Sequence, residues 1–475
     1  MPVVEALLAW ERSGLCSFHT PGHRQGREVA AEVAALLPER LFALDATELP
    51  GLDDLHHPQG IIARAQRLLA DLYGADESFF LVGGSTAGIM AALLAAGGPG
   101  KRLLMARYSH RAAFAAAILS GCRVRYLPEE WSGDGLPVGP SPAEAARAVR
   151  DWRPAVLLLT RPNYYGIGFP LEQVVEACRQ VGTVLVVDEA HGAHWGVGGL
   201  PSALDAGADL VVQSAHKTLP ALTQGAWLHL VGSRLDGVRL RASLRMVQSS
   251  SPSYLLMASL DAARWHLGRW LPEATVHLER ARQLQKRLER AGVFLLPRDL
   301  PPGWVHDPLR LVVDTAQMGW EGREAANFLR EAGIEVEWAE PDRVLILLGL
   351  RPGPDSDALA EVLTRLPGRG TRTAVVGGVA GARVGSTGIG PYPRLEAVTD
   401  PTRAWWAEQE TVPLERAVGR IAGDMLYLSP PGVPVVAPGE RWSEEALAFV
   451  RRCHEMGLVP VGRQEPGMVR VLREE

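Results

Sequence analysis

The sequence predicts an α/β protein built around a mainly parallel sheet, and three features of the chain point to this class. Between about 59 and 230, short apolar runs alternate with segments of helical periodicity. The apolar runs are nearly continuous, which is typical of strands that helices cover on both faces. Polar residues gather where several of these runs end. Because such sheets bind ligands at the carboxyl ends of their strands, we expect the functional site there.

The central region begins with a strand and a helix joined by glycines. "SFFLVGG" (78–84) predicts the strand, and "TAGIMAALLAA" (86–96) predicts a helix of small residues. Five further runs predict strands: "RLLMA" (102–106), "AVLLLT" (155–160), "TVLVVDEA" (183–190), "ADLVVQS" (208–214) and "GAWLHLV" (225–231). The intervening "PLEQVVEACRQVG" (170–182) has helical periodicity and ends in glycine.

Beyond this region an amphipathic helix, "TVHLERARQLQKRLERAG" (275–292), leads out of the large domain and stops at Gly292. One stripe of this helix carries apolar residues: Leu278, Ala281, Leu284 and Leu288. A small α/β domain is then predicted from the strands "PLRLVVDT", "IEVEWAE" (334–340) and "RVLILLG" and from the helices "GREAANFLREAG" and "DSDALAEVLTRL". The C-terminal part combines Pro-Gly turns, "SPPGVPVVAPGE", with the helix "SEEALAFVRRCHEMG".

These elements predict a division of the chain into five parts. We expect an N-terminal arm over 1–58, a large cofactor-binding domain over 59–292 and a small α/β domain over 293–366. A Gly-rich linker is expected over 367–395, and a C-terminal domain over 396–475.

Composition excludes several classes of function. The chain has 475 residues, too many for one core, with 47% hydrophobic and 22% charged residues and a formal net charge of -5. No basic field is available to hold nucleic acid or an anionic membrane. Four widely spaced cysteines favour neither a zinc site nor a disulfide framework: Cys16, Cys122, Cys178 and Cys453. With no leader sequence and no run of membrane-spanning length, we expect a soluble, cytoplasmic protein.

Lysine is scarce, and this scarcity draws attention to one residue. Of 49 basic residues only three are lysines, Lys101, Lys217 and Lys286. Arginine stays protonated in proteins, whereas a buried lysine can lose its proton and act as an amine nucleophile. Lys217 stands in "VVQSAHKTLP", just after an apolar run, and is the candidate for such a role.

An imine between Lys217 and pyridoxal 5'-phosphate (PLP) would place three demands on the neighbouring residues. An acid must face the pyridine nitrogen, and Asp188 at the end of "TVLVVD" meets this demand. Donors must surround the phosphate, and Gly84, Ser85 and Thr86 open a helix whose free N–H groups suit an anion.

The remaining predicted cofactor contacts flank these motifs. Ser214 and His216 lie on either side of Ala215, next to the lysine, and can add donors to the phosphate. His110 in "YSHRAAF" can stack on one face of the ring, with Ala190 on the opposite face and His191 beside it. The order of phosphate loop, aromatic residue, aspartate and lysine along the chain favours the cofactor over separate roles.

Taken singly, each residue also has an ordinary structural interpretation. Asp188 can cap the next helix, and Ser85 or Thr86 can be a simple N-cap. His110, His194 and His216 can be surface or hydrogen-bonded core histidines. His191 and His194 have no evident third ligand, so no metal site is predicted.

Longer motifs agree in order with those of a known family. They are "FHTPGHRQG" (18–26), "DATELPGLDDLHHPQGII" (45–62), "FFLVGGSTAG" (79–88), "VDEAHGAHWG" (187–196), "QSAHKTLPALTQGAWLH" (213–229), "SSSPSYLLMASLD" (249–261), "VPLERAVGRIAGDM" (412–425) and "PPGVPVVAPGE" (430–440). Together they resemble the PLP-dependent Orn/Lys/Arg decarboxylases of fold type I, the aspartate-aminotransferase-like fold. The resemblance covers most of the chain.

The resemblance implies specific roles for the residues singled out above. Lys217 would be the Schiff-base lysine and Asp188 the partner of the pyridine nitrogen, and His110 would stack on the ring. The phosphate would be bound near four residues: Ser85, Thr86, Ser214 and His216. Lys217, His216 or His110 would return a proton to Cα.

The chain departs from the family pattern at three places. Gly83 and Tyr108 stand where the family has Asn, and Leu428 and Ser429 stand where it often has Pro-Tyr. We also expect no N-terminal receiver-like domain of the kind that the long members have. The resemblance therefore implies a homodimer or a tetramer of dimers rather than a large ring.

The implied reaction is decarboxylation of a basic L-amino acid, with arginine ranked first, then lysine and ornithine. A cationic side chain needs carboxylates, and the loop "ELPGLDDLHH" offers Glu48, Asp53 and Asp54, with Glu440 in "VAPGE" as a further candidate. A solvated acidic loop is the alternative interpretation. Another fold type I activity, an aminotransferase or a lyase, and a non-catalytic PLP-binding protein are the competing functions.

Overall fold

The computed structural model describes residues 1–475 except 197–198, 352, 367–388, 463–464 and 475. The sequence predicts a Gly-rich linker over 367–395. Of this stretch, residues 367–388 lie outside the described part of the chain.

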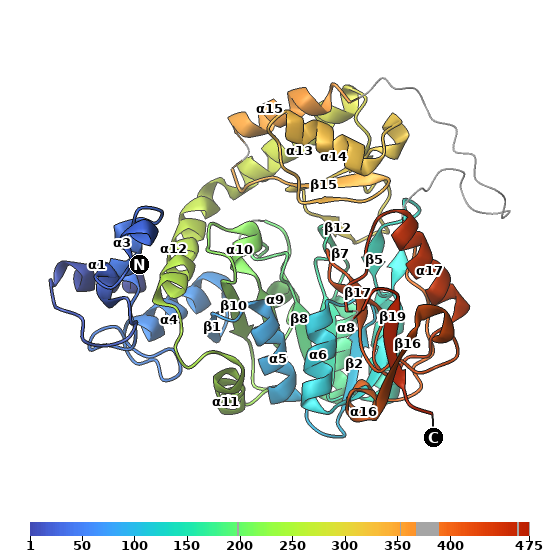
Figure 1. The fold of residues 1–475 in the computed structure, drawn as a ribbon, viewed down its shortest axis with the longest axis horizontal. Helices are drawn as coiled ribbons and strands as arrows, with labels where there is room; N and C mark the ends of the chain where they lie inside the picture. The colour runs from blue at the N-terminus through green and yellow to red at the C-terminus, as the bar shows by residue number, and fades with distance from the viewer. Residues whose placement is uncertain (197–198, 352, 367–388, 463–464, 475) are drawn as a thin grey trace.

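A seven-stranded sheet forms the centre of the molecule (Figure 1). Its strands, in spatial order, are β1 (Glu77–Leu81), β10 (Ala226–Leu230), β9 (Leu210–Gln213), β8 (Val184–Asp188), β6 (Val156–Thr160), β2 (Arg102–Ala106) and β3 (Arg123–Leu127). From β9 to β3 the neighbours are parallel, while β1 and β10 add an antiparallel edge. The six predicted strands are confirmed, and β3 is an edge strand that the sequence reasoning missed.

Helices cover both faces of this sheet, as the continuous apolar strands predict. One face is covered by α5 (Gly84–Ala96), α6 (Arg111–Ser120) and α11 (Gly237–Val247), and the other by α4 (Ile61–Tyr73), α7 (Pro142–Trp152), α8 (Glu172–Val181) and α12 (Tyr254–Trp270). Alternate residues of one strand enter different cores: Val156 and Leu158 join the first, and Leu157 and Leu159 the second.

A smaller antiparallel sheet lies above the large one in Figure 1. Its strands, in spatial order, are β11 (Leu295–Leu296), β13 (Arg310–Asp314), β15 (Arg343–Leu347) and β14 (Trp338–Ala339). Its outer face carries α13 (Ala274–Arg290), α14 (Gly322–Glu331) and α15 (Pro354–Leu363), with the predicted stripe of α13 buried. The predicted strand 334–340 is shorter than expected, because this edge segment pairs with β15 only at β14.

The inner face of the small sheet packs directly on the large unit. Val312 of β13 and Leu345 of β15 share a core cluster with Tyr164, Tyr165 and Ile167, which follow β6. This contact brings side chains of the small sheet over the carboxyl ends of the large-sheet strands.

The two ends of the chain lie on opposite sides of the large sheet (Figure 1). The N-terminal segment contains α1 (Pro2–Arg12), α2 (Ala31–Ala34) and α3 (Glu39–Leu44). The C-terminal segment contains α16 (Pro401–Trp406), β16 (Gln409–Pro413) paired with β19 (Met468–Leu472), β17 (Leu426–Leu428) paired with β18 (Val433–Val436), and α17 (Glu444–Glu455). Within the described part of the chain, no helix has the length and apolar character needed to cross a bilayer.

Candidate active site

Two neighbouring strand ends bring the predicted acid and lysine to one pocket. Asp188 is the last residue of β8, and Lys217 lies in the short helix α10 (Ala215–Thr218), which follows β9. The strands β8 and β9 are parallel neighbours, so their carboxyl ends lie at the same edge of the sheet. Both side chains line a single pocket, together with Ser85 and His110.

The ring of His191 joins Lys217 to an arginine of the small sheet. Its Nε2 lies 3.1 Å from Lys217 Nζ, and its Nδ1 lies 3.2 Å from Nη2 of Arg310. A guanidinium only donates, so Nδ1 accepts, and the proton of a neutral ring must sit on Nε2. Burial, together with the charges of Lys217 and Arg310, lowers the pKa of His191 well below its ordinary value. Nε2–H can then donate only to an uncharged lysine amine, which is the nucleophilic form.

Burial also lowers the pKa of Lys217, as it does that of His191. Asp188 opposes this shift by raising the pKa, and Arg310 adds to it. Burial and Arg310 therefore favour the free amine of Lys217, whereas the carboxylates of Asp188 and Glu337 favour the cation.

Asp188 is a buried carboxyl with little solvation. Its Oδ1 accepts a hydrogen bond from the N–H of Ala190 at 3.2 Å, and its side chain is almost fully buried. Burial raises the pKa of Asp188, against the opposing effects of Lys217 and the Ala190 N–H. A cation placed against this carboxyl would stabilise its charged form.

The predicted phosphate loop and the lysine loop meet through two hydroxyls. Ser214 Oγ donates to Ser85 Oγ at 2.9 Å, and Ser214 is the N-cap residue of α10. Gly84 begins α5 with a φ of 73°, a conformation that favours glycine. Thr86, one residue further, is exposed. A side chain at Gly83 would place its Cβ 2.9 Å from that of Ala87, which accounts for glycine at this departure from the family pattern.

The two other predicted histidines occupy different surroundings. His110 is the N-cap of α6, where its Nδ1 accepts from the N–H of Ala112 at 3.2 Å, and burial lowers its pKa to about 4. Its ring lies against Gly432 of the C-terminal segment, where an added Cβ would come within 2.6 Å of the ring. His216 is half-buried, and its Nδ1 lies 3.0 Å from the carbonyl oxygen of Gly225.

His194 does not join the pocket. Its Nε2 lies 2.9 Å from Oδ2 of the buried Asp307, whose carboxylate also receives Leu309 N–H through Oδ1. Among the residues that the structure describes, no group of three potential ligands has the geometry of a metal site.

Several residues around the pocket were missed by the sequence reasoning. Tyr164 lines it and donates from its hydroxyl to Glu337 of the small unit at 2.9 Å, while Pro431 and Val433 close it from the C-terminal segment. Arg310 had one sequence signal, a charged residue inside a buried strand. Glu337 had none, because its place depends on how the small sheet packs on the large one.

The four acidic residues predicted to recognise substrate do not line this pocket within the chain. Glu48, Asp53 and Asp54 instead surround Tyr254, whose hydroxyl donates to the Asp53 carbonyl at 2.5 Å. The Asp53 carboxylate accepts from the backbone N–H groups of Gln59, Gly60 and Ile62 at 2.8 to 2.9 Å, which makes it a cap for α4.

Glu440 also has a partner already. Its carboxylate accepts two hydrogen bonds from Arg107, at 2.7 and 2.8 Å, and one from the N–H of Ala437. This buried ion pair leaves no free carboxylate for a substrate cation at Glu440.

The residues of the pocket fit PLP. The buried Asp188 carboxyl matches a protonated pyridine nitrogen, and the Lys217 amine, whose pKa is lowered by burial, matches an aldehyde. The adjoining hydroxyls of Ser85 and Ser214, beside the first turn of α5, supply donors of the kind that a phosphate requires.

Comparisons with known proteins identify relatives over nearly the whole chain. The family model described as "Orn/Lys/Arg decarboxylase, major domain" matches residues 1–299, and the model of the C-terminal domain of the same family matches 383–460. The chain is 36% identical to "Uncharacterized protein YaaO" of Bacillus subtilis, covering 96% of this chain and 94% of the relative. It is 33% identical to an arginine decarboxylase of Bacillus subtilis, covering 96% and 95%.

Solved structures share the fold at lower sequence identity. The lysine decarboxylase LdcF of Francisella novicida superposes with a TM-score of 0.84 at 18% identity, covering 99% of this chain and 81% of that chain. The constitutive lysine decarboxylase of Escherichia coli superposes with a TM-score of 0.81 at 21% identity, covering 99% and 82%. A Bacillus subtilis ureidoglycine-glyoxylate aminotransferase shares the fold over 64% of this chain, with a TM-score of 0.53. The predicted fold type I architecture is therefore confirmed.

Proposed function

The chain belongs to the Orn/Lys/Arg decarboxylase family and is a PLP-dependent amino-acid decarboxylase, and from this premise we propose that it removes CO2 from L-arginine. Lysine ranks second and ornithine third as substrates, and the product is agmatine or the corresponding diamine. The arginine ranking is supported by the curated relatives of comparable length that are called arginine decarboxylase. Substrate recognition is supported best by one observation, the carboxylate of Glu337 beside the Lys217 pocket.

Glu337 is placed to receive the distal cation of a basic substrate. It is exposed, it is bonded to the pocket residue Tyr164, and its charge raises the pKa of Lys217, so the two groups lie within electrostatic reach. A guanidinium can pair with a carboxylate through two parallel hydrogen bonds, whereas an ammonium makes a point contact. Glu337 thus replaces the loop of Glu48, Asp53 and Asp54 as our candidate for the specificity carboxylate within one chain.

Each residue of the pocket has a separate task in the proposed reaction. PLP, when bound, supplies an electron sink for the bond that breaks at Cα. Lys217 would hold the cofactor covalently, Asp188 would hold a proton at its ring nitrogen, and Ser85 and Ser214 would bind its phosphate. His191 would orient the lysine amine through Nε2–H, because Arg310 fixes the opposite ring nitrogen.

The proton that returns to Cα is assigned to Lys217. The substrate enters with an ammonium group, so the Lys217 amine would take up that proton when the substrate amine takes its place, and it would remain in the pocket near His191. The alternatives are less suited, because His110 has a pKa of about 4 and carries no extra proton at neutral pH, and the His216 ring is bonded to the Gly225 carbonyl.

A product assay with arginine, lysine and ornithine tests the proposal. We expect CO2 and agmatine in equal amounts, with the highest kcat/KM for arginine. A keto acid instead would identify an aminotransferase, and absence of turnover with all three would identify a non-catalytic relative. Light scattering of the same preparation tests the proposed homodimer or tetramer of dimers.

A further inference from the structure

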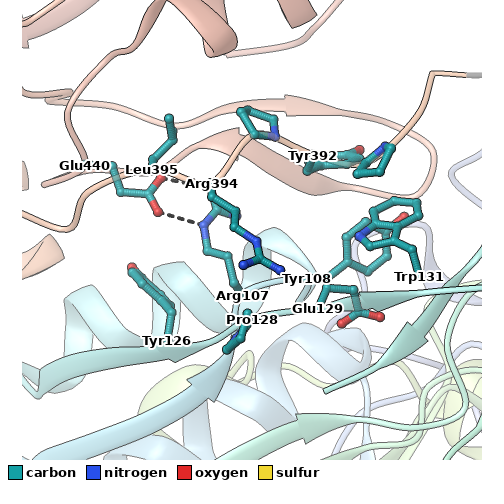
Figure 2. A pocket seen from close by; sticks show the side chains of 12 residues that line it. Arg107, Tyr108, Tyr126, Pro128, Glu129, Trp131, Tyr392, Arg394, Leu395 and Glu440 are labelled. Atoms are coloured by element: carbon teal, nitrogen blue, oxygen red, sulfur yellow. Dashed lines mark hydrogen bonds and ion pairs between the residues drawn. The ribbon is translucent and has the colours of Figure 1, made fainter. Parts of the chain in front are cut away.

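A second cavity lies beside the candidate active site, between the large sheet and the C-terminal segment (Figure 2). Its volume is about 390 Å³, within the range of about 300 to 1,000 Å³ that is usual for small-molecule sites. Residues following β2 and β3 form one wall, and residues 391–395 form the other. We call it the outer cavity.

Three aromatic rings form one end of the outer cavity. The rings of Tyr108 and Tyr392 lie edge to face with centroids 5.2 Å apart, and Tyr108 meets Trp131 in the same way at 5.7 Å. Trp131 and Tyr392 are nearly parallel, with centroids 6.4 Å apart. Such a group of rings attracts organic cations through its π faces.

Two ionisable side chains of the outer cavity have no ion-pair partner among the described residues. Arg107 is satisfied, because it pairs with Glu440 and donates to two backbone carbonyls. Glu129 accepts one hydrogen bond, from Gly139 N–H at 2.6 Å, and makes no ion pair with any described residue. Arg394 is exposed and likewise forms no ion pair within the described part of the chain. Both residues line the outer cavity, and Figure 2 shows Arg394 beside Tyr108 and the Glu129 carboxylate below Trp131.

Two further observations indicate that the outer cavity is built for a polar ligand. The Tyr126 hydroxyl in its wall is buried and has no hydrogen-bond partner among the described residues. Burial raises the pKa of Glu129 to about 8, so its charged form is unfavourable until a cation approaches. A hydroxyl that is buried without a hydrogen-bond partner carries a desolvation cost.

Tyr108 connects the outer cavity to the candidate active site. It is almost fully buried, and its side chain lines both the outer cavity and the pocket that contains Lys217. A ligand in the outer cavity would therefore touch a residue that also borders the site of the reaction.

We propose that the outer cavity binds a second molecule of basic amino acid as an intact zwitterion, with its cationic side chain against Trp131, Tyr392 and Glu129 and its carboxylate at Arg394. The choice of a basic amino acid rests on the proposed function. The charge pattern requires a ligand with both signs, and the planar guanidinium of arginine matches both an aromatic face and a carboxylate. The amine product has no carboxylate and cannot use Arg394, and a simple anion cannot use Glu129 or the rings.

The test is a titration of arginine into holoenzyme that has first been treated with borohydride. This reagent fixes an aldehyde cofactor on its lysine, so that arginine can no longer be processed at Lys217. Calorimetry should then still report one arginine site per chain. Glu129→Gln and Arg394→Gln should each weaken arginine binding by about tenfold or more, equivalent to about 1.4 kcal/mol. Glu144→Gln, at an exposed glutamate that does not line the outer cavity, is the matched control and should bind arginine as the unsubstituted chain does.

Agmatine distinguishes the two ends of the site. It should bind more weakly than arginine, and Arg394→Gln should not weaken it further. Arginine binding that neither variant alters, or no arginine binding after reduction, would refute the proposal. Equal binding of agmatine and arginine would refute the carboxylate contact and leave a site for cations. Circular dichroism and Tm establish that each variant is folded, and Trp131→Leu, which keeps both charges, gives an independent expectation of several-fold weaker binding.

The borohydride step separates this proposal from the proposed function. If acid denaturation releases the cofactor after reduction, Lys217 does not hold it covalently and the proposed function fails. The arginine titration tests only whether substitution of Glu129 or Arg394 weakens arginine binding. Its outcome therefore does not depend on whether the cofactor is released after reduction.

Discussion

The floor and the roof of the candidate active site are built in different ways. The floor consists of Asp188 and Lys217 at the ends of two adjacent parallel strands, with Ser85 and Ser214 joined by a hydrogen bond. The roof comes from the small sheet, which supplies Arg310 and Glu337 through contacts to His191 and Tyr164. The floor is set by strand order within one sheet, whereas the roof depends on the packing of one sheet on another.

This difference suggests a division of labour. The floor carries the groups that the proposed chemistry needs for any amino acid, namely a covalent anchor and a charge partner for the ring nitrogen. The roof carries the groups to which we assign the adjustment of protonation and the choice of side chain. Variants of the floor should therefore abolish turnover, and variants of the roof should change its pH dependence or its substrate preference.

The largest effect is expected for the lysine of the floor. Lys217→Ala should lose the visible absorbance of the bound cofactor and reduce kcat by about 10⁴-fold or more, since it removes both the anchor and the assigned proton donor. Lys217→Arg is the control that keeps the charge without the nucleophile, and it should be equally inactive. A normal cofactor spectrum in Lys217→Ala would show that another residue holds the cofactor.

Asp188→Asn should leave the fold intact and lower kcat by about 10² to 10³-fold, equivalent to about 3 to 4 kcal/mol, because a buried charge partner is lost. Steady-state kinetics at saturating cofactor measure this loss. Near-normal turnover would contradict the assignment of Asp188 to the ring nitrogen.

For the roof, Glu337→Gln should raise KM for arginine by about ten- to a hundredfold, since a hydrogen bond to a charged group contributes about 1.5 to 3 kcal/mol. The change in kcat should be small. Glu335→Gln is the matched control, because Glu335 is exposed and pairs with Arg330 away from the pocket. An equal rise in KM in both variants would show a general charge effect rather than recognition by Glu337.

Arg310→Gln should shift the pH dependence of PLP loading while leaving the Lys217 pocket intact. The charge of Arg310 lowers the pKa of Lys217, so its loss should raise that pKa and keep the amine protonated to a higher pH. Loading of apoprotein with PLP requires the free amine, and its pH midpoint should therefore move upward. A rise of one unit in the pKa of Lys217 would lower the fraction of free amine at neutral pH, and therefore the rate of PLP loading, by about tenfold. Arg310→Lys, which retains the charge, should load near the original midpoint, and an unchanged midpoint in Arg310→Gln would exclude this role.

The same contrast explains how much the sequence could predict. The strands β8 and β9, and the polar residues at their ends, follow from local apolar runs, because parallel order places those ends together. Residues 334–340 gave a strand signal but no indication that Glu337 approaches Lys217, since that depends on Val312 and Leu345 packing on the tyrosines after β6. Charge alone gave no sign that the Asp53 carboxylate accepts hydrogen bonds from backbone N–H groups of its own segment.

The smallest effect on catalysis is expected at Asp53, which lies outside both floor and roof. Its carboxylate is partly buried, which acts to raise its pKa, but backbone N–H groups that include those of Gln59 and Gly60 outweigh this effect and lower it. Because the folded-state pKa is depressed, the stabilisation is present above the unfolded value of about 3.9 and is lost as the pH falls through the folded value. Asp53→Ala should therefore lower the free energy of unfolding by about 1 kcal/mol at neutral pH, the usual cost of losing a helix cap, and by less at acid pH.

Denaturant unfolding at neutral and at acid pH measures this difference. Asp53→Asn still caps the helix and tolerates the left-handed backbone at this position, so it should lose less stability than Asp53→Ala. If instead Asp53→Ala raises KM for arginine while its stability is unchanged, the acidic loop recognises substrate, and the specificity carboxylate is not confined to the roof.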